Sequence, residues 1–405
     1  MLKRYRYRAY PTPSQEQYLA RVFGSVRVVY NDFITYRNRQ FDSGEKFTPG
    51  SAMQVKLITE ARHTEERQWL SEVPNVCLQQ SIRDADRAYT NFFSSIAGKR
   101  KGRRVGVPRF KKRTNEQQAR ITRPRVRETT HGVGFLKFPK MDKEIRFNLS
   151  RPLPSKPTSA TVIKEPDGRY YVSFVVDVGE PTPLPETDTV AGIDLGLTDL
   201  AIVAQSDGER YKVPNSRHLK RKERKLAKAQ KELSRRKKGS KNREKSRIKV
   251  AKLHRKVRET RLDNLRKVSL DIVRENQVIA IESLSVEGLR KTWLGKAIND
   301  VGWSTFTRLL QERADEYGRT IVKIDRFAPT TKTCSVCGSV GTSKPLHVRV
   351  WECDGCHTVL DRDYNASVNI MLAAGLADRI NDCGGNVRLR LAVADPVEAV
   401  THRRA

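Results

Sequence analysis

The stretch Val190-Ala-Gly-Ile-Asp-Leu-Gly-Leu-Thr198 places one acid, Asp194, in the middle of an apolar strand. The same pattern recurs in Val278-Ile-Ala-Ile-Glu-Ser-Leu284, where the acid is Glu282. A carboxylate inside an apolar strand costs free energy unless something compensates its charge. Side chains alternate along a strand, so the residue two positions before each acid lies on the same face as the acid. That residue is Gly192 in one strand and an alanine in the other, so each acid has a small neighbour and room beside it.

A third acid, Asp363, stands where a helix begins, in the segment Asp361-Arg-Asp. Two acids at the ends of adjacent core strands and a third at a helix start would offer hard oxygen ligands to one or two Mg²⁺ ions. Such a site activates water and stabilises the leaving 3′-oxygen in an in-line phosphodiester displacement. A turn or a helix cap explains any one acid equally well, and Asp363 is also consistent with a helix N-cap. The set of three, in the order strand, strand and helix, favours a nuclease site on a ribonuclease H-like fold.

Two cysteine pairs, Cys334-Ser-Val-Cys337 and Cys353-Asp-Gly-Cys356, are separated by fifteen residues, which is the spacing of a zinc ribbon. Four thiolates make a closed tetrahedral site with no open position, so a catalytic Zn²⁺ is disfavoured. We expect one structural Zn²⁺ ion that folds the loop leading to the third acid.

The chain has 405 residues and a net charge of +33, from 79 Lys and Arg against 46 Asp and Glu. Residues 98–128 carry a net charge of +11 and residues 217–267 a net charge of +19, whereas the rest is nearly neutral. Such concentrated charge predicts a polyanionic partner, for which nucleic acid is the natural candidate. A solvated helix face or a disordered basic tail would explain one run, but two runs in a folded chain favour nucleic acid. The candidate contacts are Arg109, Lys111, Lys112, Arg221, Lys225, Arg235, Lys252 and Arg255.

Composition also excludes several classes of protein. A hydrophobic content of 37% is too high for a wholly disordered chain, and the length predicts two or three domains. No segment approaches the roughly 18 apolar residues of a membrane helix, and the basic N-terminus lacks the apolar region of a signal peptide. We therefore expect a cytoplasmic protein of the prokaryotic cytosol or nucleoid, with no membrane partner.

The first part of the chain combines strand and helix patterns. Residues 2–10 alternate as a strand that ends at Pro11-Thr-Pro13. Ser14 is then expected to cap a helix, with Gln17 in the capping box. Further helical patterns cover residues 25–40, 51–62 and 76–97. Short strands are expected at 133–138, 144–148, 159–164 and 170–178, and together with the first strand they predict a small β domain.

A proline-rich linker precedes a second domain, which begins near Thr189 with a three-strand meander. The second basic segment has helical spacing with a break at Gly239-Ser240, which predicts a long helical hairpin with one packed face. The expected elements that follow are a strand at 277–284, a helix at 305–317, a strand at 320–327 and a helix at 363–374. The tail from Asn381 has a weak pattern and is expected to be flexible.

These features together resemble the TnpB family, which comprises transposon-encoded RNA-guided nucleases related to type V CRISPR effectors. The resemblance runs from about Tyr5 to Ala374, and the order and spacing of its motifs make it specific. The motifs are Tyr10-Pro-Thr-Pro13, Trp69-Leu-Ser-Glu-Val-Pro74, Asp86-Arg-Ala-Tyr-Thr-Asn-Phe-Phe93, Pro108-Arg-Phe-Lys-Lys112, Gly192-Ile-Asp-Leu-Gly196, Ile281-Glu-Ser-Leu284, Lys332-Thr-Cys-Ser-Val-Cys-Gly338 and Asp361-Arg-Asp-Tyr-Asn-Ala366.

The resemblance implies an α/β multidomain fold. Residues 1–10 and 105–180 would form a wedge-like β-barrel domain, residues 11–104 a helical recognition domain, and residues 181–188 a linker. An RNase H-like (RuvC) nuclease domain would comprise residues 189–328 and 361–380, with the basic hairpin at 215–276, an inserted zinc ribbon at 329–360 and a flexible tail at 381–405.

The resemblance also implies an activity. Asp194, Glu282 and Asp363 match the catalytic triad that holds Mg²⁺, and the four cysteines match the zinc ligands of the family. The implied reaction is two-metal cleavage of double-stranded DNA, addressed by a guide RNA from the transposon end and licensed by a short target-adjacent motif. Base pairing would read the sequence while a monomeric protein holds the heteroduplex by its backbone. Two residues depart from the pattern, because His357 replaces a common Gly and Leu360 replaces a common His.

Two other functions are consistent with the same residues. A transposase or accessory transposition protein would use an Asp/Glu/Asp site on this fold to join DNA strands. A nuclease-dead RNA-guided repressor would only bind DNA, but the presence of all three acids argues against this possibility.

Overall fold

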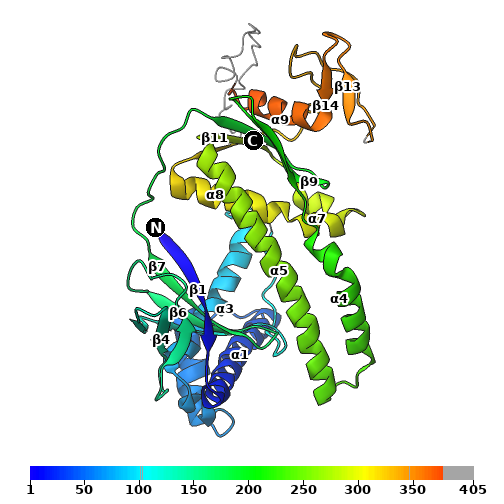
Figure 1. The fold of residues 1–405 in the computed structure, drawn as a ribbon. Helices are drawn as coiled ribbons and strands as arrows, with labels where there is room; N and C mark the ends of the chain where they lie inside the picture. The colour runs from blue at the N-terminus through cyan, green and yellow to red at the C-terminus, as the bar shows by residue number, and fades with distance from the viewer. Residues whose placement is uncertain (101, 103, 346, 377–405) are drawn as a thin grey trace, which may run out of the picture. The chain divides into compact units, whose positions relative to one another are not determined.

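The computed structural model describes residues 1–376 except 101, 103 and 346 (Figure 1). The chain divides into two compact units. The first unit is Met1–Glu180 with Arg236–Lys252, and the second unit is Pro181–Arg235 with the chain from Leu253 onward. In the described part of the chain, no helix is both long enough and apolar enough to cross a membrane. The tail at 381–405 lies outside the described residues.

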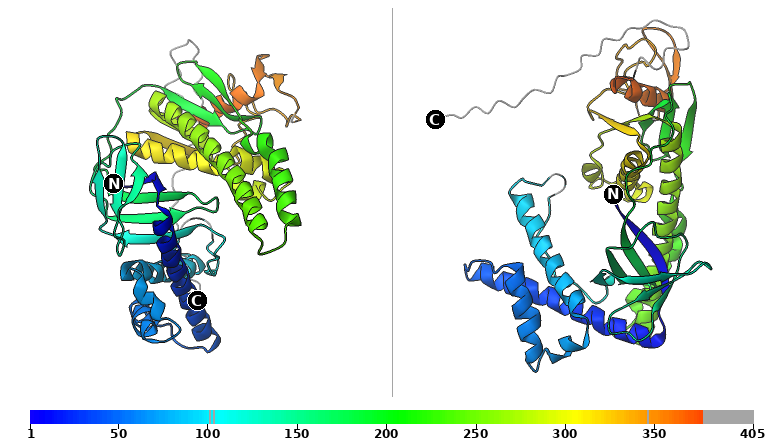
Figure 2. Two further views of the ribbon diagram at one scale, coloured as in Figure 1. Left: turned by 60° about the horizontal axis from the view of Figure 1, so that its bottom comes forward. Right: turned by 90° about the vertical axis from the view of Figure 1, so that its left-hand side faces the viewer.

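The first unit begins with a strand and a helical region. Strand β1 (Leu2–Tyr10) is followed by α1 (Pro13–Asp42), α2 (Gly50–Gln54), the π-helix η1 (Val55–Glu60), the 3₁₀ turns η2 (Ala61–His63) and η3 (Gln68–Glu72), and α3 (Asn75–Ile96). The ribbons of the long helices α1 and α3 cross and contact each other (Figure 2). Buried apolar side chains such as Phe33 and Leu78 form their shared core. The Ser81 hydroxyl adds a hydrogen bond to the Val26 carbonyl at 2.7 Å.

The start of α1 differs from the expectation. Thr12, not Ser14, is the N-cap, and its hydroxyl accepts the Gln15 N–H while the Gln15 side chain accepts the Thr12 N–H. The capping box therefore lies two residues earlier than predicted. The physical reason is Pro13, whose fixed φ and missing N–H suit the first helical position.

A seven-stranded antiparallel sheet completes the first unit. Its remaining strands are β2 (Gln117–Thr122), β3 (Arg125–Glu128), β4 (Val133–Lys137), β5 (Ile145–Asn148), β6 (Ser159–Lys164) and β7 (Tyr170–Asp177), in the order β2-β6-β7-β1-β5-β4-β3. The predicted strands are confirmed, but the sequence pattern does not predict β2 and β3. Both lie in the first basic segment, where charged and amide side chains hide the alternation of Ala119 and Ile121.

The second unit is built on a five-stranded sheet in the order β10-β9-β8-β11-β12. Its strands are β8 (Val190–Asp194), β9 (Asp199–Gln205), β10 (Arg210–Pro214), β11 (Val278–Glu282) and β12 (Thr320–Ile324). The meander β8-β9-β10 is antiparallel, whereas β11 runs parallel to both β8 and β12. The carboxyl ends of β8, β11 and β12 therefore meet at one edge of the sheet.

Helices cover both faces of this sheet. The helices are α4 (His218–Arg235), α5 (Lys241–Glu275), α6 (Val286–Leu289), α7 (Gly295–Val301), α8 (Trp303–Tyr317) and α9 (Arg362–Ala373), and a small sheet is formed by β13 (Val350–Glu352) and β14 (Val359–Asp361). Buried residues of α5 and α8, including Leu265 and Phe306, pack with Ile193 and Ile281 on one face. Residue Ile370 of α9 packs with Ala280 and Ile324 on the other face.

The basic helical hairpin is confirmed as α4 and α5, joined by a turn at Gly239, which has a φ of +85° (Figure 1). Its predicted apolar positions include the buried residues Leu226, Ala229 and Val257. Residues 236–252, at the turn and the start of α5, belong to the first unit, where the Arg247 guanidinium donates to the Pro166 carbonyl at 3.0 Å. The sequence pattern does not predict the short helices α6 and α7.

Helix α9 approaches strand β8 closely because Gly192 has no side chain. A Cβ at Gly192 would lie 2.0 Å from the Ser367 carbonyl oxygen and 2.9 Å from the Met371 backbone nitrogen. Both contacts are to the backbone of α9, which cannot move as a flexible side chain can. Sequence reasoning treats Gly192 as room beside Asp194, but the structure fills that room with α9.

We expect Gly192→Ala to destabilise the second unit by about 3 kcal/mol, the upper end of the usual cost of overpacking. Thermal and urea unfolding of the full chain would measure the change. Gly24→Ala in α1 is the matched control, because a Cβ there meets nothing within 4 Å. Alanine is the better helix former, so this control should be neutral or slightly stabilising. Equal stability of the two variants would contradict the proposed packing constraint.

Candidate functional site

Two of the predicted acids end adjacent parallel strands. The register pairs Val190 with Val278 and continues to the pair Ile193 and Ile281. Asp194 is the last residue of β8 and Glu282 is the last residue of β11, so the two acids lie side by side at the carboxyl edge of the sheet. This edge is where α/β sheets commonly bind ligands.

The third acid, Asp363, lies in the first turn of α9. The helix cap is Asp361, whose carboxylate accepts the N–H groups of Asp363 at 2.9 Å and Tyr364 at 3.0 Å. The alternative that Asp363 is itself the cap is therefore wrong. The Asp363 carboxylate instead faces two cations. It accepts a hydrogen bond from Arg349 at 3.1 Å, and the Lys212 ammonium lies 3.8 Å away.

The electrostatics of Asp194 show that the other two acids act on it. Burial, together with the charges of Glu282 and Asp363, raises the pKa of Asp194 to about 7, against the lowering effect of the Leu195 N–H and the Arg362 charge. Burial also raises the pKa of Glu282, opposed by a 2.8 Å hydrogen bond from the Thr330 hydroxyl. Mutual repulsion of this kind favours a cation between the carboxylates.

Thr330 connects the second acid to α9, which sequence reasoning does not predict. The Thr330 side chain donates to Glu282, while its carbonyl accepts the amides of Asn365 at 3.4 Å and Asn369 at 2.7 Å. The two asparagines are four residues apart and buried. Buried amides at this spacing on one helix face are the sequence signal that could have revealed the link.

Lys212 and Arg349 are two further residues of the site that the sequence does not reveal. Lys212, on β10, lies 3.0 Å from the Asp361 carboxylate and 4.7 Å from the centroid of the Tyr364 ring. Arg349 precedes β13 in the cysteine module and pairs with Asp363. Both cations come from segments far from the acids in sequence, so only the fold brings them together.

The four cysteines form a compact cluster. The Sγ atoms of Cys334 and Cys356 are 3.7 Å apart and those of Cys337 and Cys353 are 3.6 Å apart. A tetrahedron with Zn–S bonds of about 2.3 Å has S–S distances of about 3.8 Å, so the cluster fits this ion. Trp351 and Leu360 form a small core with the cysteines.

The cysteine cluster and the acidic site differ in how closely their donor atoms approach. Within the described ranges, the four cysteines form a group of possible metal ligands whose donor atoms all lie within 4.8 Å of one another. The three carboxylates lie at one edge of the sheet, but they do not form so tight a group. The cysteine module is joined to the acidic site, because the Asn365 side chain accepts the Ser335 N–H at 2.8 Å.

The structure places the eight predicted nucleic-acid contacts in two classes. Six side chains are exposed, namely Arg109, Lys112, Arg221, Lys225, Arg235 and Lys252. The other two are half-buried with partners of their own. The Lys111 ammonium lies 3.8 Å from the Tyr30 ring centroid, and burial lowers its pKa. Arg255 pairs with Glu259.

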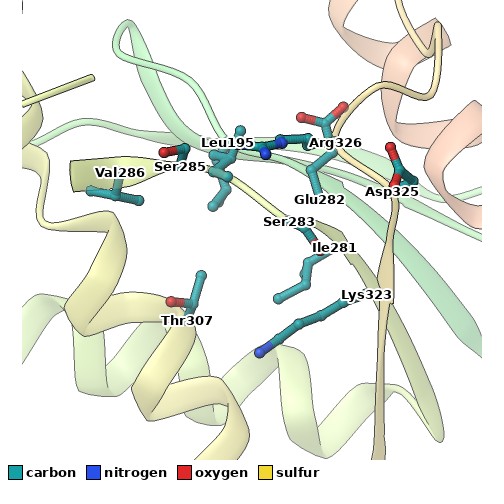
Figure 3. Close-up of a pocket in the computed structure, with 11 residues that line it drawn as sticks. Leu195, Ile281, Glu282, Ser283, Ser285, Val286, Thr307, Lys323, Asp325 and Arg326 are labelled. Atoms are coloured by element: carbon teal, nitrogen blue, oxygen red, sulfur yellow. The ribbon is translucent and has the colours of Figure 1, made fainter. Parts of the chain in front are cut away.

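A cleft of about 590 Å³ opens beside Glu282 (Figure 3). Its walls come from the segments that follow β11 and β12 and from Thr307 on α8. Figure 3 shows Glu282 and Arg326 at one end of the cleft, and Lys323 with Thr307 at the other. The cleft therefore opens at the same edge of the sheet as the acids, and Glu282 is the one of the three that lines it.

Comparisons with known proteins agree with this architecture. Residues 173–292 match the family model described as a probable transposase, residues 303–370 match the Cas12f1-like TNB domain, and residues 1–46 match a helix-turn-helix domain. In the structure, residues 1–46 form strand β1 and one uninterrupted helix, α1, instead of two helices with a turn.

Two relatives align over nearly the whole chain. A Streptomyces pristinaespiralis protein, provisionally named an RNA-guided DNA endonuclease, is 41% identical over 388 residues, which cover 95% of this chain and 91% of the relative. The Escherichia coli K12 protein InsQ carries the same provisional name and is 29% identical over 403 residues, covering 96% and 95% of the two chains.

Two solved structures share the fold. One is a cryo-EM structure of a Cas12f1-sgRNA-target DNA complex, with a TM-score of 0.54, 13% identity and coverage of 91% of this chain and 98% of that chain. The other is the mini-RNA-guided endonuclease CRISPR-Cas_phi3, with a TM-score of 0.52, 10% identity and 92% coverage of both chains.

The cysteine cluster predicts a tightly held metal ion. We expect Cys353→Ser to lose about one equivalent of zinc per chain, measured by plasma mass spectrometry after dialysis, because three thiolates bind Zn²⁺ far more weakly than four. Cys77→Ala is the matched control, since Cys77 is buried in the core of the first unit and does not belong to the four-cysteine cluster. Retention of zinc by Cys353→Ser, or its loss from Cys77→Ala, would contradict the assignment.

Proposed function

Because the chain belongs to the TnpB family, we propose that it is an RNA-guided DNA endonuclease that cleaves double-stranded DNA beside a short target-adjacent motif. The observation that carries the proposal is the convergence of Asp194, Glu282 and Asp363 at one edge of the second sheet. Burial and mutual repulsion raise the pKa of Asp194, as expected where carboxylates are gathered for a metal.

In this proposal the three acids hold Mg²⁺, because hard carboxylate oxygens are the donors that this ion prefers. Bound Mg²⁺ would supply an activated water and stabilise the leaving oxygen of the phosphodiester. The other residues keep the ligands in place. Thr330 fixes one oxygen of Glu282, and Asp361 fixes the first turn of the helix that carries Asp363. The four cysteines would hold one structural Zn²⁺.

The basic surfaces would hold the nucleic acids. A guide RNA from the transposon end would pair with one DNA strand, and the protein, as a monomer in the ribonucleoprotein, would bind the heteroduplex backbone. The exposed cations of the hairpin, such as Arg221 and Lys252, suit this role because they face solvent. Residues 11–104 would then serve as the recognition domain, and residues 1–10 with 105–180 as the wedge domain.

Strand joining is the second candidate, favoured by the match of residues 173–292 to a model described as a probable transposase. A transposase would yield joined DNA ends, whereas an endonuclease would leave free ends. Sequencing the products of a plasmid reaction, with and without the copurified RNA, separates the two activities.

We expect Asp194→Ala to abolish cleavage of a guide-matched plasmid, because it removes a ligand from the metal site, while RNA binding stays unchanged. Gel analysis of a time course would measure cleavage, and filter binding would measure RNA affinity. Asp315→Ala, an exposed acid on α8, is the control and should cleave as the wild type does. Cleavage by Asp194→Ala at the wild-type rate would overturn the assigned triad.

We also expect the hairpin to set the salt dependence of heteroduplex binding. Replacing Arg221, Lys225 and Lys252 together by Gln should lower the slope of log affinity against log salt by about 2–3, since each lost phosphate contact removes about 0.9. Fluorescence anisotropy at several salt concentrations would measure the slope. Replacing Arg308, which pairs with Glu312 on α8, is the control and should leave the slope unchanged. An unaltered slope in the triple variant would exclude phosphate contacts at these residues.

A further inference from the structure

A short segment, residues 330–335, connects the cysteine cluster to the second acid. At one end of the segment, the Thr330 hydroxyl donates to the Glu282 carboxylate at 2.8 Å. At the other end, Ser335 lies between the first two cysteines of the cluster. A displacement of this backbone at the cysteines would therefore reach the hydroxyl that holds the acid.

Two asparagines of α9 hold the segment along its length. Both side-chain amides donate to the Thr333 carbonyl, Asn365 at 2.8 Å and Asn369 at 2.6 Å. Asn369 also donates to the Thr330 carbonyl at 2.7 Å, and Asn365 accepts the Ser335 N–H at 2.8 Å. The two asparagines are 2% and 6% exposed, and hydrogen bonds of buried groups are costly to leave unmade. The segment and the helix therefore keep one fixed arrangement.

The buried core of the cysteine module is small. In the part of the module that the structure describes, Trp351 and Leu360 pack with the cysteines, and the two strands β13 and β14 have three residues each. A module of this kind usually folds only when its cysteines bind a metal. The metal therefore fixes the end of residues 330–335 that carries Ser335.

The hydrogen bond at the other end supports a proposed ligand of the acidic site. Partners that hydrogen-bond to a metal-binding carboxylate orient it, and their removal commonly weakens metal binding by about 10–100-fold. Thr330 is 5% exposed, and its N–H donates to the Ala328 carbonyl at 2.8 Å, so the hydroxyl has a defined position. It keeps this position only while residues 330–335 keep theirs.

We infer that Thr330, Asn365 and Asn369 are positioning residues that couple the cysteine cluster to the acidic site, so that Zn²⁺ at the cysteines strengthens the binding of Mg²⁺ at the acids. The inference rests on the proposed function and gives the zinc site a role beyond the folding of its own module. Coupling between two binding sites is reciprocal, so Mg²⁺ at the acids must strengthen the binding of Zn²⁺ by the same factor. A zinc ion that only folds its module would show no such factor.

The first test measures metal binding by the full chain without RNA or DNA. Mn²⁺ is the probe for the acidic site, and its affinity is measured by electron paramagnetic resonance, with Asp194→Ala as the background. The retention of zinc is measured by plasma mass spectrometry during treatment with a chelator that is selective for zinc over Mg²⁺, with and without Mg²⁺. Neither measurement depends on DNA cleavage.

For the wild type, we expect saturating Mg²⁺ to slow the loss of zinc about tenfold. Removal of zinc should weaken the binding of Mn²⁺ about tenfold, because the factor is the same in both directions. A factor of about ten lies within the usual range of coupling between two sites.

Thr330→Val removes the hydroxyl and keeps the shape of the side chain. We expect this variant to weaken Mn²⁺ binding about tenfold and to lose the protection of zinc by Mg²⁺, but to retain zinc as the wild type does when Mg²⁺ is absent. Thr330→Ser should recover most of the Mn²⁺ affinity, because it restores the donor. The ion pair of Arg349 with Asp363 is unchanged in both variants, so the effect reports the connection through Thr330.

Asn365→Leu should weaken both the retention of zinc and the binding of Mn²⁺, because its amide contacts both ends of the segment. Asn276→Leu is the matched control for the loss of a buried amide. Asn276 is fully buried in the second unit and donates to the Ile272 carbonyl at 3.0 Å. We expect both variants to lower the melting temperature, but only Asn365→Leu to change metal binding. An equal change of metal binding in the control would overturn the inference.

The second test uses the ribonucleoprotein with target DNA. For Thr330→Val, the Mg²⁺ concentration that gives half of the maximal single-turnover rate should rise about tenfold, whereas the rate at saturating Mg²⁺ should stay within about threefold of the wild type. A variant that merely misfolds would lose rate at every Mg²⁺ concentration. Target affinity is measured alongside and should not change.

The two tests separate the inference from the proposed function. If the wild type cuts no DNA under any guide, the proposed function fails, and the first test still decides the inference. If Mg²⁺ does not change the retention of zinc in the wild type, or if Thr330→Val binds Mn²⁺ as the wild type does, the inference is overturned.

Discussion

The close contact between helix α9 and strand β8 is the constraint on which the site depends. Only glycine at position 192 allows the Ser367 carbonyl to lie where a Cβ would stand. This contact places the first turn of α9, with Asp363, beside the carboxyl edge that holds Asp194 and Glu282. The same helix holds the Thr330 carbonyl through two buried asparagines, so it also orients Glu282. This packing contact therefore positions Asp363 and helps to orient Glu282, whereas the register of β8 and β11 places Asp194 beside Glu282.

Acidic and basic side chains are unevenly distributed, and acids gather at this edge of the sheet. Three carboxylates are gathered where burial and repulsion raise the pKa of Asp194, an arrangement that a divalent cation stabilises. Lys212 and Arg349 pair with the acids of the first turn of α9, so that turn carries both signs of charge. Most of the remaining excess charge lies in two segments, 98–128 and 217–267. The surfaces proposed to bind the nucleic-acid backbone and the proposed metal site therefore lie on different parts of the chain.

Particular residues show why some expectations failed. The cap of α1 shifted to Thr12 because Pro13 is favoured at the first helical position. Strands β2 and β3 consist mostly of charged and amide residues; β2 pairs with β6, far along the chain, and β3 pairs with the next strand, β4. Gly192 suggests free space when only its own strand is considered, because the helix that fills the space is far away in sequence. For β2 and Gly192 the deciding partner lies far away in sequence, whereas for the cap of α1 it is the neighbouring residue Pro13.

The sequence by itself determined the family, the two strands that end in acids, the cysteine cluster and the distribution of charge. These properties are local, since periodicity, spacing and composition need no knowledge of distant contacts. Only the tertiary structure decided that Asp361 caps α9, that Thr330 holds Glu282, and that Lys323 and Arg326 line a cleft beside that acid. The physical reason is that hydrogen bonds and clefts form between segments that the order of residues does not place together.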